Sequence, residues 1–251
     1  MNGGLGLGLC MLYLSVIVLI PLAAVLVKAF SSGLGTLWDS IDNTLTLQAL
    51  AITLGASLIV AAIGAVMGTL VAWVLVRDSF PGKRFVNSLI DLPFALPTIV
   101  AGLTLIALYG PRSPIGIHLA YTRGVVIVAL LFVTLPFVVR SVQPVLIELD
   151  REVEEAAASL GASNATTFRR VVLPALRPAV LSGAALAFAR SIGEFGSLAL
   201  IAGKVQIASI VIYADIESGS EQSAAALSVV LMVIALIVLF ILRRIGARVG
   251  H

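Results

Sequence analysis

Charged residues are scarce in this chain of 251 residues, where Asp, Glu, Lys and Arg make up only 12% and hydrophobic residues 60%. A soluble domain of this length carries about twice that charged fraction. The mean hydropathy of +1.12 points the same way. So few charges cannot cover a surface that faces water. The composition therefore excludes an ordinary soluble protein and makes the lipid bilayer the expected solvent.

Cysteine and histidine are almost absent as well. The single cysteine, Cys10, excludes a disulfide framework and a thiolate metal cluster. The two histidines, His118 and His251, lie far apart and outside the apolar runs, so we expect no metal site. The basic pI of 9.4 is typical of loop charges in a membrane protein and does not indicate nucleic acid as a partner.

Patterns that carry enzymatic chemistry are also missing. The chain has no Gly-x4-Gly-Lys-Ser/Thr phosphate loop, so we do not expect it to hydrolyse ATP itself. The dipeptide Gly196-Ser197 lacks the flanking pattern of a serine hydrolase, and no histidine within the apolar runs could serve as its base. We therefore expect no catalytic residue and no cofactor held by this chain.

Six apolar runs are long enough to cross a membrane as helices, which predicts an all-α membrane protein. We expect one transmembrane domain over 1–251, with spans near 9–30, 46–76, 85–109, 124–142, 179–202 and 224–242. The second run, of about 31 residues, would be roughly 46 Å long as a helix, so it must tilt or project past the bilayer.

Basic residues are distributed unevenly between the connecting segments. If both termini lie inside, the outer segments hold only Lys28, Arg112, Arg123 and Lys204. Apart from Arg190 within the fifth run, the others lie on the inner side: Arg77, Lys83, Arg84, Arg140, Arg151, Arg169, Arg170, Arg177, Arg243, Arg244 and Arg248. Since basic residues concentrate on the cytoplasmic side, this bias predicts a multi-pass protein of the cell (inner) membrane with both termini in the cytoplasm.

Two prolines, Pro93 and Pro97, fall within the third run. Each removes a backbone donor and clashes with the carbonyl four residues before it, so we expect a kinked or locally unwound helix. Unwound backbone at membrane depth is tolerated only against protein or a water-filled cavity. The third run is therefore a candidate lining of a pathway, although a purely structural kink is an equal alternative.

Arg190 lies near the middle of the fifth apolar run, Glu194 one turn later, and Asp91 in the inner third of the third run. An unpaired charge there costs at least ~2.5–3.5 kcal/mol, so we expect ion pairs, with Glu194 and Asp91 as candidate partners of Arg190. A structural network or gate is favoured over a direct contact with a transported anion, because conduction needs weak, distributed contacts. Neutral donors would suit a passing anion better. The candidate pathway or gate residues are Asp91, Pro93, Pro97, Thr98, Arg190, Glu194 and Ser197.

The longest polar interval, 148–174, has the pattern of a helix–turn–helix elbow. The side chains that share one helical face are apolar: Leu149, Val153, Ala156, Ala157 and Leu160. Gly161 can adopt the positive φ that ends a helix, Ser163 can cap a second short helix, and Pro174 would end that one. An apolar stripe outside the membrane needs a partner, which a merely solvated loop would not supply.

The elbow resembles the signature loop, or EAA motif, of permeases from binding-protein-dependent ABC importers. The match is Glu155-Ala156-Ala157-x3-Gly161-x9-Val171-x-Leu173-Pro174, with Val171 where the family prefers isoleucine. The resemblance implies the type I importer permease fold, with the elbow as a coupling helix in a cleft of a cytoplasmic ATPase subunit. The implied coupling residues are Glu154, Glu155, Ala156, Ala157, Gly161, Leu173 and Pro174.

The resemblance also implies partners. It implies two cytoplasmic ABC ATPase subunits that bind ATP and Mg²⁺, a second permease subunit that is a different chain, and an extracytoplasmic binding protein. An acidic segment with Asp215, Glu217 and Glu221, placed outside by the charge distribution, is a candidate contact for that binding protein or simply a solvated loop.

Four further segments, 92–98, 135–140, 142–146 and 188–196, resemble the sulfate/thiosulfate importer permeases, and among these the T-type subunit. This implies import of sulfate by ATP-driven alternating access, with thiosulfate left open. The segment 188–196 is shared with molybdate and tungstate permeases, which are the alternative within the class. A secondary anion transporter is a more distant alternative, and ATP dependence of uptake would distinguish it.

Overall fold

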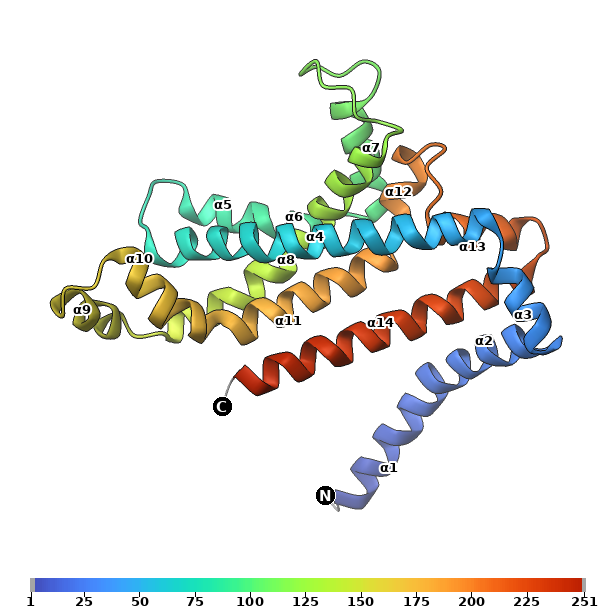
Figure 1. Cartoon of the computed structure of the whole chain (residues 1–251), viewed down its shortest axis with the longest axis horizontal. Coiled ribbons are helices and arrows are strands. Elements are labelled where there is room, and N and C mark those ends of the chain that lie inside the picture. The colour runs from blue at the N-terminus through green and yellow to red at the C-terminus, as the bar shows by residue number, and fades with distance from the viewer. Residues whose placement is uncertain (1–2, 250–251) are drawn as a thin grey trace. The chain divides into compact units, whose positions relative to one another are not determined.

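The computed structural model describes residues 3–249, and His251 lies outside them. All regular structure in the described residues is helical, which confirms the expected all-α class (Figure 1). The elements in chain order are α1 (Gly3–Leu14), η1 (Ser15–Leu19), α2 (Ile20–Phe30), α3 (Gly33–Ile41), α4 (Thr44–Arg77), α5 (Lys83–Ile90), α6 (Leu92–Ala95), α7 (Thr98–Tyr109), α8 (Arg123–Glu148), α9 (Arg151–Ser159), α10 (Asn164–Thr167), η2 (Phe168–Val172), α11 (Leu173–Ile192), α12 (Gly196–Ile201), α13 (Ala208–Glu217) and α14 (Glu221–Val249). The elements η1 and η2 are single π-helical turns.

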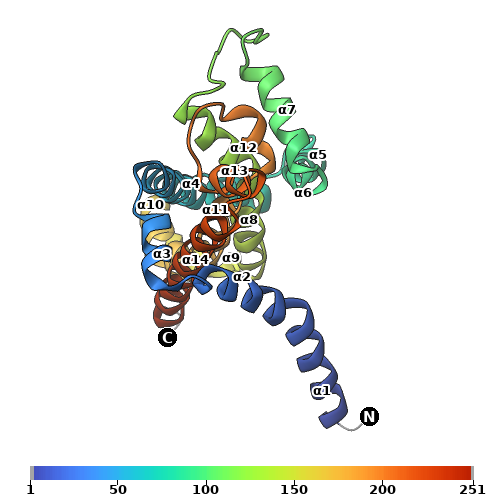
Figure 2. The same cartoon turned by 90° about the vertical axis from the view of Figure 1, so that its right-hand side faces the viewer.

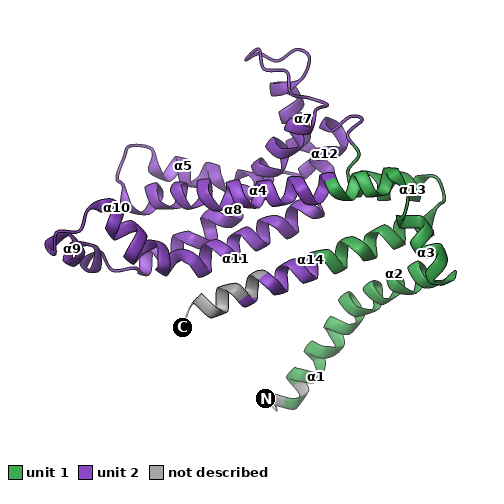
Figure 3. Cartoon of the chain, in the orientation of Figure 1, with its two compact units in different colours: residues 1–51, 206–234 green, residues 52–205, 235–251 purple. Residues whose placement is uncertain are grey.

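The chain forms two compact units, shown in different colours in Figure 3. Unit 1 consists of residues 1–51 and 206–234, and unit 2 of residues 52–205 and 235–251. The expectation of a single transmembrane domain over 1–251 stays a prediction. Unit 2 contains the elbow and all the candidate pathway residues, so the site is described within it.

Among residues 3–249, five helical stretches are long and apolar enough to cross a membrane. They are Gly6–Phe30, Thr44–Arg77, Arg123–Glu148, Asn164–Ile192 and Glu221–Ile241. They confirm helices over the expected spans 9–30, 46–76, 124–142 and 224–242. Helix α4 has 34 residues, and at 1.5 Å per residue it is about 51 Å long.

The expected span 85–109 is not one continuous helix. It is divided into α5, α6 and α7, with Leu96 in an extended conformation (φ −86°, ψ 135°). Pro93 lies in the first turn of α6, and Pro97 directly precedes α7. The prolines cause the break because neither can donate the hydrogen bond that would continue the preceding turn. The local unwinding predicted from Pro93 and Pro97 is confirmed, and the uninterrupted span is wrong.

The expected span 179–202 is wrong at both ends. The helical stretch begins at Asn164 and ends at Ile192, and a short helix, α12, follows after a break at 193–195. Pro174 does not end the elbow's second helix, because it lies in the first turn of α11. The preceding π turn explains this: the Leu173 N–H donates to the Phe168 carbonyl, and this wider turn continues the helix up to the proline ring.

The core of unit 2 lies where α8 packs along α11 and α4 (Figures 1 and 2). Val138 of α8 is fully buried there. A Cβ atom at Gly68 of α4 would lie 2.7 Å from the Val138 Cβ, and one at Gly183 of α11 would lie 2.8 Å from its Cα. Glycine at these two positions lets the neighbouring helices approach α8 closely, as is common for helices packed in lipid.

Unit 1 has a smaller core of Ala29, Ala225 and Val229, with Leu37 packed against it. The Lys28 ammonium lies 2.7 Å from the Glu221 carboxylate, so the end of α2 is paired with the start of α14. In the apolar stretch Gly6–Phe30, no residue of the most hydrophobic part is buried against the rest of the chain. Its surroundings are therefore lipid or another chain.

Candidate functional site

The turn of the elbow is built by local hydrogen bonds. The Asp150 side chain accepts a 3.0 Å hydrogen bond from the Glu152 N–H and caps α9. Gly161, with φ +84°, follows the end of this helix. The Ala162 N–H donates to the Ala157 carbonyl and the Gly161 N–H to the Ala158 carbonyl. This is the Schellman arrangement that a left-handed residue after a helix makes possible, and it confirms the stop predicted at Gly161.

The second arm of the elbow begins at Ser163. Its hydroxyl accepts a 3.3 Å hydrogen bond from the Thr166 N–H, which confirms the predicted cap of α10. Both ends of the turn are therefore held by backbone and capping hydrogen bonds, and the elbow has a defined shape without a partner.

The outer face of α9 is exposed and largely apolar. Leu160 is 90% exposed and Val153 47% exposed, while Glu155 and Ala156 are also exposed. Leu149 and Ala157, which were placed on the same stripe, are half-buried. The exposed surface of Val153, Glu155, Ala156 and Leu160 is called the outer elbow face below.

The inner face of α9 is attached to the end of α4. The Arg77 guanidinium donates to the Glu154 carboxylate at 2.5 Å and to the Leu149 carbonyl at 3.0 Å. In return, Arg151 donates to the Arg77 carbonyl at 2.9 Å. The Arg77 and Glu154 side chains are only 10% and 22% exposed. Glu154 therefore points toward α4, away from the outer elbow face.

An aromatic contact extends this attachment to the second arm of the elbow. The Arg77 guanidinium lies 5.8 Å from the centre of the Trp73 ring, in a cation–π geometry. Trp73 in turn meets Phe168 edge to face, with ring centres 5.5 Å apart. Both arms of the elbow thus contact one end of α4.

The Leu173-Pro174 pair of the motif is half-buried at the start of α11. It does not contribute to the outer elbow face, and the structure separates it in this way from Glu155 and Ala156.

The break between α11 and α12 is organised by Glu194. This side chain is 1% exposed, and its Oε1 accepts hydrogen bonds from the Ser197 N–H and the Ser197 hydroxyl, both at 2.8 Å. Its Oε2 lies 2.7 Å from an Arg190 nitrogen, which confirms the predicted i,i+4 ion pair. The Arg190 side chain is 32% exposed. Glu194 thus satisfies the first turn of α12 and balances the charge of Arg190 at once.

Asp91 does not contact Arg190, so that proposed pairing is wrong. Asp91 instead makes a bidentate ion pair with Arg140 of α8, a residue that the sequence reasoning assigned only to a loop charge. Arg140 uses all five N–H donors: two on Asp91, one each on the Asn87 side chain and carbonyl, and one on Gln143. The spacing could have indicated it, because Asp91 follows Asn87 by four residues at the end of α5, and Arg140 and Gln143 lie three apart on α8.

Helices α7 and α12 pack closely against each other beside the break between α11 and α12 (Figure 1). A Cβ atom at Gly196 would lie 2.1 Å from the Thr98 hydroxyl oxygen, and one at Gly102 would lie 2.5 Å from the Ser197 carbonyl oxygen. The structure therefore brings the α7 break, with Pro97 and Thr98, next to the α12 break, with Glu194 and Ser197. Two interrupted helices meet at this contact. The predicted pathway residues Asp91 and Pro93 are not part of either helix, because both precede α7 in the chain.

On unit 1, the acidic residues Asp215 and Glu217 lie in helix α13, where a solvated loop was one alternative. Burial raises the pKa of the Asp215 carboxyl, and a hydrogen bond with Glu217 raises the pKa of the Tyr213 hydroxyl. In the described part of the chain, no group of three or more His, Cys, Asp or Glu side chains could hold a metal ion.

Apolar helices long enough to cross a membrane, two adjoining helix breaks and a capped elbow outside the apolar stretches are the features expected of a membrane-embedded transport subunit. Solved importer structures share the fold. A chain of a bacterial ABC transporter involved in the import of the acidic polysaccharide alginate is 15% identical, with a TM-score of 0.77 over 96% of this chain and 93% of that one. A chain of the MetNI methionine ABC transporter is 22% identical, with a TM-score of 0.67 over 82% of this chain and 96% of that one.

The chain belongs to the family of binding-protein-dependent transport system inner membrane components, whose pattern matches residues 64–251. It is 43% identical to the sulfate transport system permease protein CysT of Synechococcus elongatus, over 92% of this chain and 87% of that protein. It is 40% identical to the CysT protein of Salmonella typhimurium, over 98% of this chain and 93% of that protein. The family and the T-type resemblance expected from the motifs are confirmed.

Proposed function

We propose that this chain is a permease subunit of an ABC importer that carries sulfate into the cytoplasm by ATP-driven alternating access. The observation that carries the proposal is the identity of 40–44% with sulfate permeases over most of the length of both chains. Molybdate permeases share one motif with this chain, but the relatives reported above carry sulfate in their names. Thiosulfate remains a second substrate to test.

The outer elbow face is the docking surface for a cytoplasmic ATPase subunit. Its apolar side chains, Val153, Ala156 and Leu160, would be buried in a cleft of that subunit, and Glu155 would make polar contacts at the rim. The elbow's defined shape lowers the entropic cost of docking. ATP and Mg²⁺ would be bound by the two ATPase subunits, because the sequence of this chain contains no Gly-x4-Gly-Lys-Ser/Thr phosphate loop.

Glu154 has a different role from Glu155 in this proposal. Through Arg77 it attaches the docked elbow to α4, so that a displacement of the elbow is transmitted to a membrane helix. Glu154 is thus a positioning residue, while Glu155 contacts the partner. Gly161 fixes the turn between the arms, and Leu173 and Pro174 connect the second arm to α11.

The two helix breaks form the gate of the anion pathway. Glu194 balances the charge of Arg190, so a sulfate dianion would not be held by an isolated cation. Neutral donors near the breaks, such as the Thr98 hydroxyl, would provide weaker contacts. Both breaks lie where α7 and α12 meet, and sliding of these short helices would open or close the passage.

The remaining partners follow from the same proposal. A second, different permease completes the membrane part, and an extracytoplasmic sulfate-binding protein delivers the anion to the side that holds α13. Both chain termini lie in the cytoplasm and the protein spans the inner membrane several times, as the distribution of Lys and Arg supports.

The decisive experiment is reconstitution of the chain with its partner subunits in liposomes, followed by uptake of sulfate, thiosulfate and molybdate in parallel. We expect sulfate uptake that requires ATP and the binding protein. Uptake without ATP would indicate a secondary transporter, and ATP-dependent uptake of molybdate alone would overturn the assignment to sulfate.

A further inference from the structure

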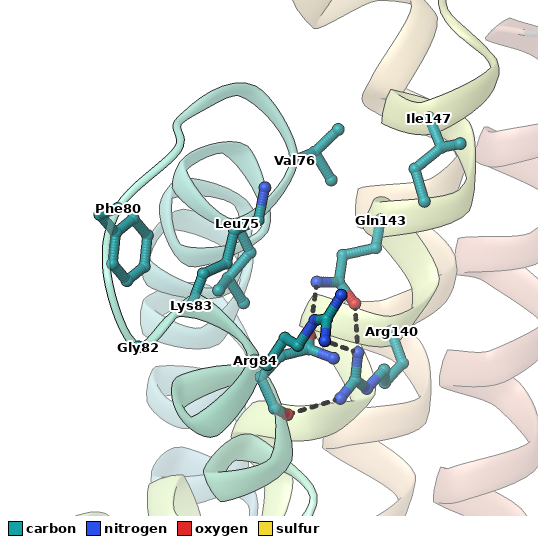
Figure 4. Close-up of a pocket in the computed structure, with 10 residues that line it drawn as sticks. Leu75, Val76, Phe80, Gly82, Lys83, Arg84, Arg140, Gln143 and Ile147 are labelled. Atoms are coloured by element: carbon teal, nitrogen blue, oxygen red, sulfur yellow. Dashed lines mark hydrogen bonds between the residues drawn. The ribbon is translucent and has the colours of Figure 1, made fainter.

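A cavity of about 750 Å³ lies between the end of α4, the 78–82 connection, the start of α5 and the second half of α8. Figure 4 shows its lining: Leu75 and Phe80 lie on one side, and Gln143 and Ile147 on the other. All lining residues belong to unit 2. None of them is a residue of the outer elbow face or of the α7–α12 contact, although Arg140, Asn87 and Gln143 belong to the hydrogen-bond network around Asp91.

The cavity has a surplus of positive charge. Arg140 forms part of its wall, but the ion pair with Asp91 cancels its charge and its donors are all occupied. Lys83 and Arg84 also line it. The Lys83 ammonium donates one hydrogen bond to the Asp78 carbonyl, while the exposed Arg84 guanidinium makes no ion pair within the described residues. Two cations are thus available to a ligand.

A neutral donor lies beside these cations. The Asn87 side-chain oxygen accepts from Arg140 and Gln143, which orients its amide nitrogen. That nitrogen donates to no other residue in the described range, so it is free to donate to an anionic oxygen. A group with a negative charge and several acceptor oxygens fits this end of the cavity.

The rest of the lining is apolar, with Leu75, Val76, Phe80 and Ile147. A small inorganic oxyanion would leave this apolar surface in water, whereas a ligand with a hydrocarbon tail would cover it. Helix α5 is amphipathic, and its apolar residues Phe85 and Leu89 are 72% and 51% exposed. These side chains place α5 at the boundary of the hydrocarbon region, with Lys83 and Arg84 toward the headgroups.

We propose that this cavity binds an anionic phospholipid, with the headgroup phosphate on Lys83, Arg84 and the Asn87 amide and an acyl chain along Leu75, Val76 and Phe80. The site lies on the side of the membrane that the proposed orientation makes cytoplasmic, where anionic lipid headgroups attract basic residues. The lipid connects the end of α4 with α5 and α8, three elements that converge at the cavity.

The test measures lipid retention by the purified full-length chain in native mass spectrometry. Dioleoyl phosphatidylglycerol and dioleoyl phosphatidylcholine are added in turn at equal concentration. We expect preferential retention of phosphatidylglycerol, and a loss of about 30-fold in its affinity in a K83Q/R84Q variant, since each basic residue near an anionic lipid surface contributes about fivefold. Both substituted side chains are partly or fully exposed, so the variant should fold, which circular dichroism checks.

The matched control is R169Q/R170Q, which removes two exposed cations from the same predicted side of the membrane but outside the cavity. We expect it to retain phosphatidylglycerol as the unaltered chain does. Equal retention of both lipids, or equal loss in both double variants, would overturn the site. So would displacement of phosphatidylglycerol by millimolar sulfate, because the cavity would then hold a free oxyanion. None of these results depends on transport, so they leave the proposed import function untouched.

Discussion

Glu154 and Glu155 are neighbours in sequence but lie in different surroundings. Glu154 is paired with the nearly buried Arg77, whereas Glu155 is exposed on the outer elbow face. A Glu154→Ala substitution leaves the Arg77 charge without its carboxylate and should destabilise the elbow's attachment by about 2 kcal/mol, less than the ~3–5 expected for a fully buried pair. We expect sulfate uptake to fall while co-purification with the ATPase subunit is largely retained.

The matched variant Glu155→Lys should have the opposite effect. It changes the docking surface without disturbing the Arg77 contact, so co-purification in detergent should fall. If both variants lower co-purification equally, the two glutamates do not have separate roles. A double-mutant cycle with Arg77→Ala measures the coupling between Arg77 and Glu154. The loss of stability in Arg77→Ala/Glu154→Ala should be smaller than the sum of the losses in the two single variants.

Glu194 also has two contacts that substitution can separate. In Glu194→Gln the amide oxygen can still accept from Ser197, but Arg190 loses its counter-charge, which costs at least ~2.5–3.5 kcal/mol at membrane depth. We expect this variant to lose thermal stability in detergent and most of its uptake. Adding Arg190→Met removes the unpaired charge and should restore part of both.

Complete loss of sulfate uptake in Arg190→Met/Glu194→Gln, with normal assembly and stability, would contradict this prediction. It would mean that Arg190 contacts the transported anion directly and does not merely hold the break between α11 and α12.

At the scale of elements, the elbow depends on a backbone conformation that only glycine adopts readily. Gly161 has φ +84°, and a β-branched residue there is strained by at least about 1–2 kcal/mol. Gly161→Val should distort the turn and reduce coupled uptake while the subunit still inserts in the membrane. Gly55→Val is the control, because Gly55 lies in a helix with open space around its Cβ position. Unchanged ATP-driven uptake in Gly161→Val would count against the docking role.

The contact between α7 and α12 gives a second prediction at this scale. A methyl group at Gly102 would meet the Ser197 backbone, which cannot rotate away as a side chain can. Gly102→Ala should therefore push the two helices apart and lower stability by about 1–3 kcal/mol. Gly55→Ala, which meets no neighbour, should be neutral. Equal melting temperatures for both variants in detergent would mean that the helices do not pack as described.

Local sequence patterns predicted correctly where these elements turn, begin or unwind, but they did not predict correctly how far the helices extend. The stop at Gly161, the cap at Ser163 and the unwinding at Pro93 and Pro97 follow from single residues with strong backbone preferences, and all are found. The path of the chain through Pro174 could not be predicted, because a π turn replaces the expected break. The pairing of Asp91 with Arg140 also escaped prediction, since 49 residues separate the partners and only the packing of α6, which Asp91 directly precedes, against α8 joins them.

At the scale of the whole molecule, the described residues leave apolar side chains uncovered both on the membrane helices and on the elbow. No residue in the most hydrophobic part of the Gly6–Phe30 stretch is buried. On the outer elbow face, Val153 and Leu160 are exposed. The first surface suits lipid or a second permease. The second, which lies beside charged residues and outside the membrane, suits an ATPase subunit in an assembled importer.

Photo-crosslinking in the assembled transporter tests this claim most directly. A photoreactive amino acid replaces Leu160, which is 90% exposed on the elbow, or Leu236, which is 59% exposed on a membrane helix. We predict an efficient crosslink to the ATPase subunit from position 160 and none from position 236. No crosslink from position 160 in a complex that takes up sulfate, or equal crosslinking from both positions, would contradict the account.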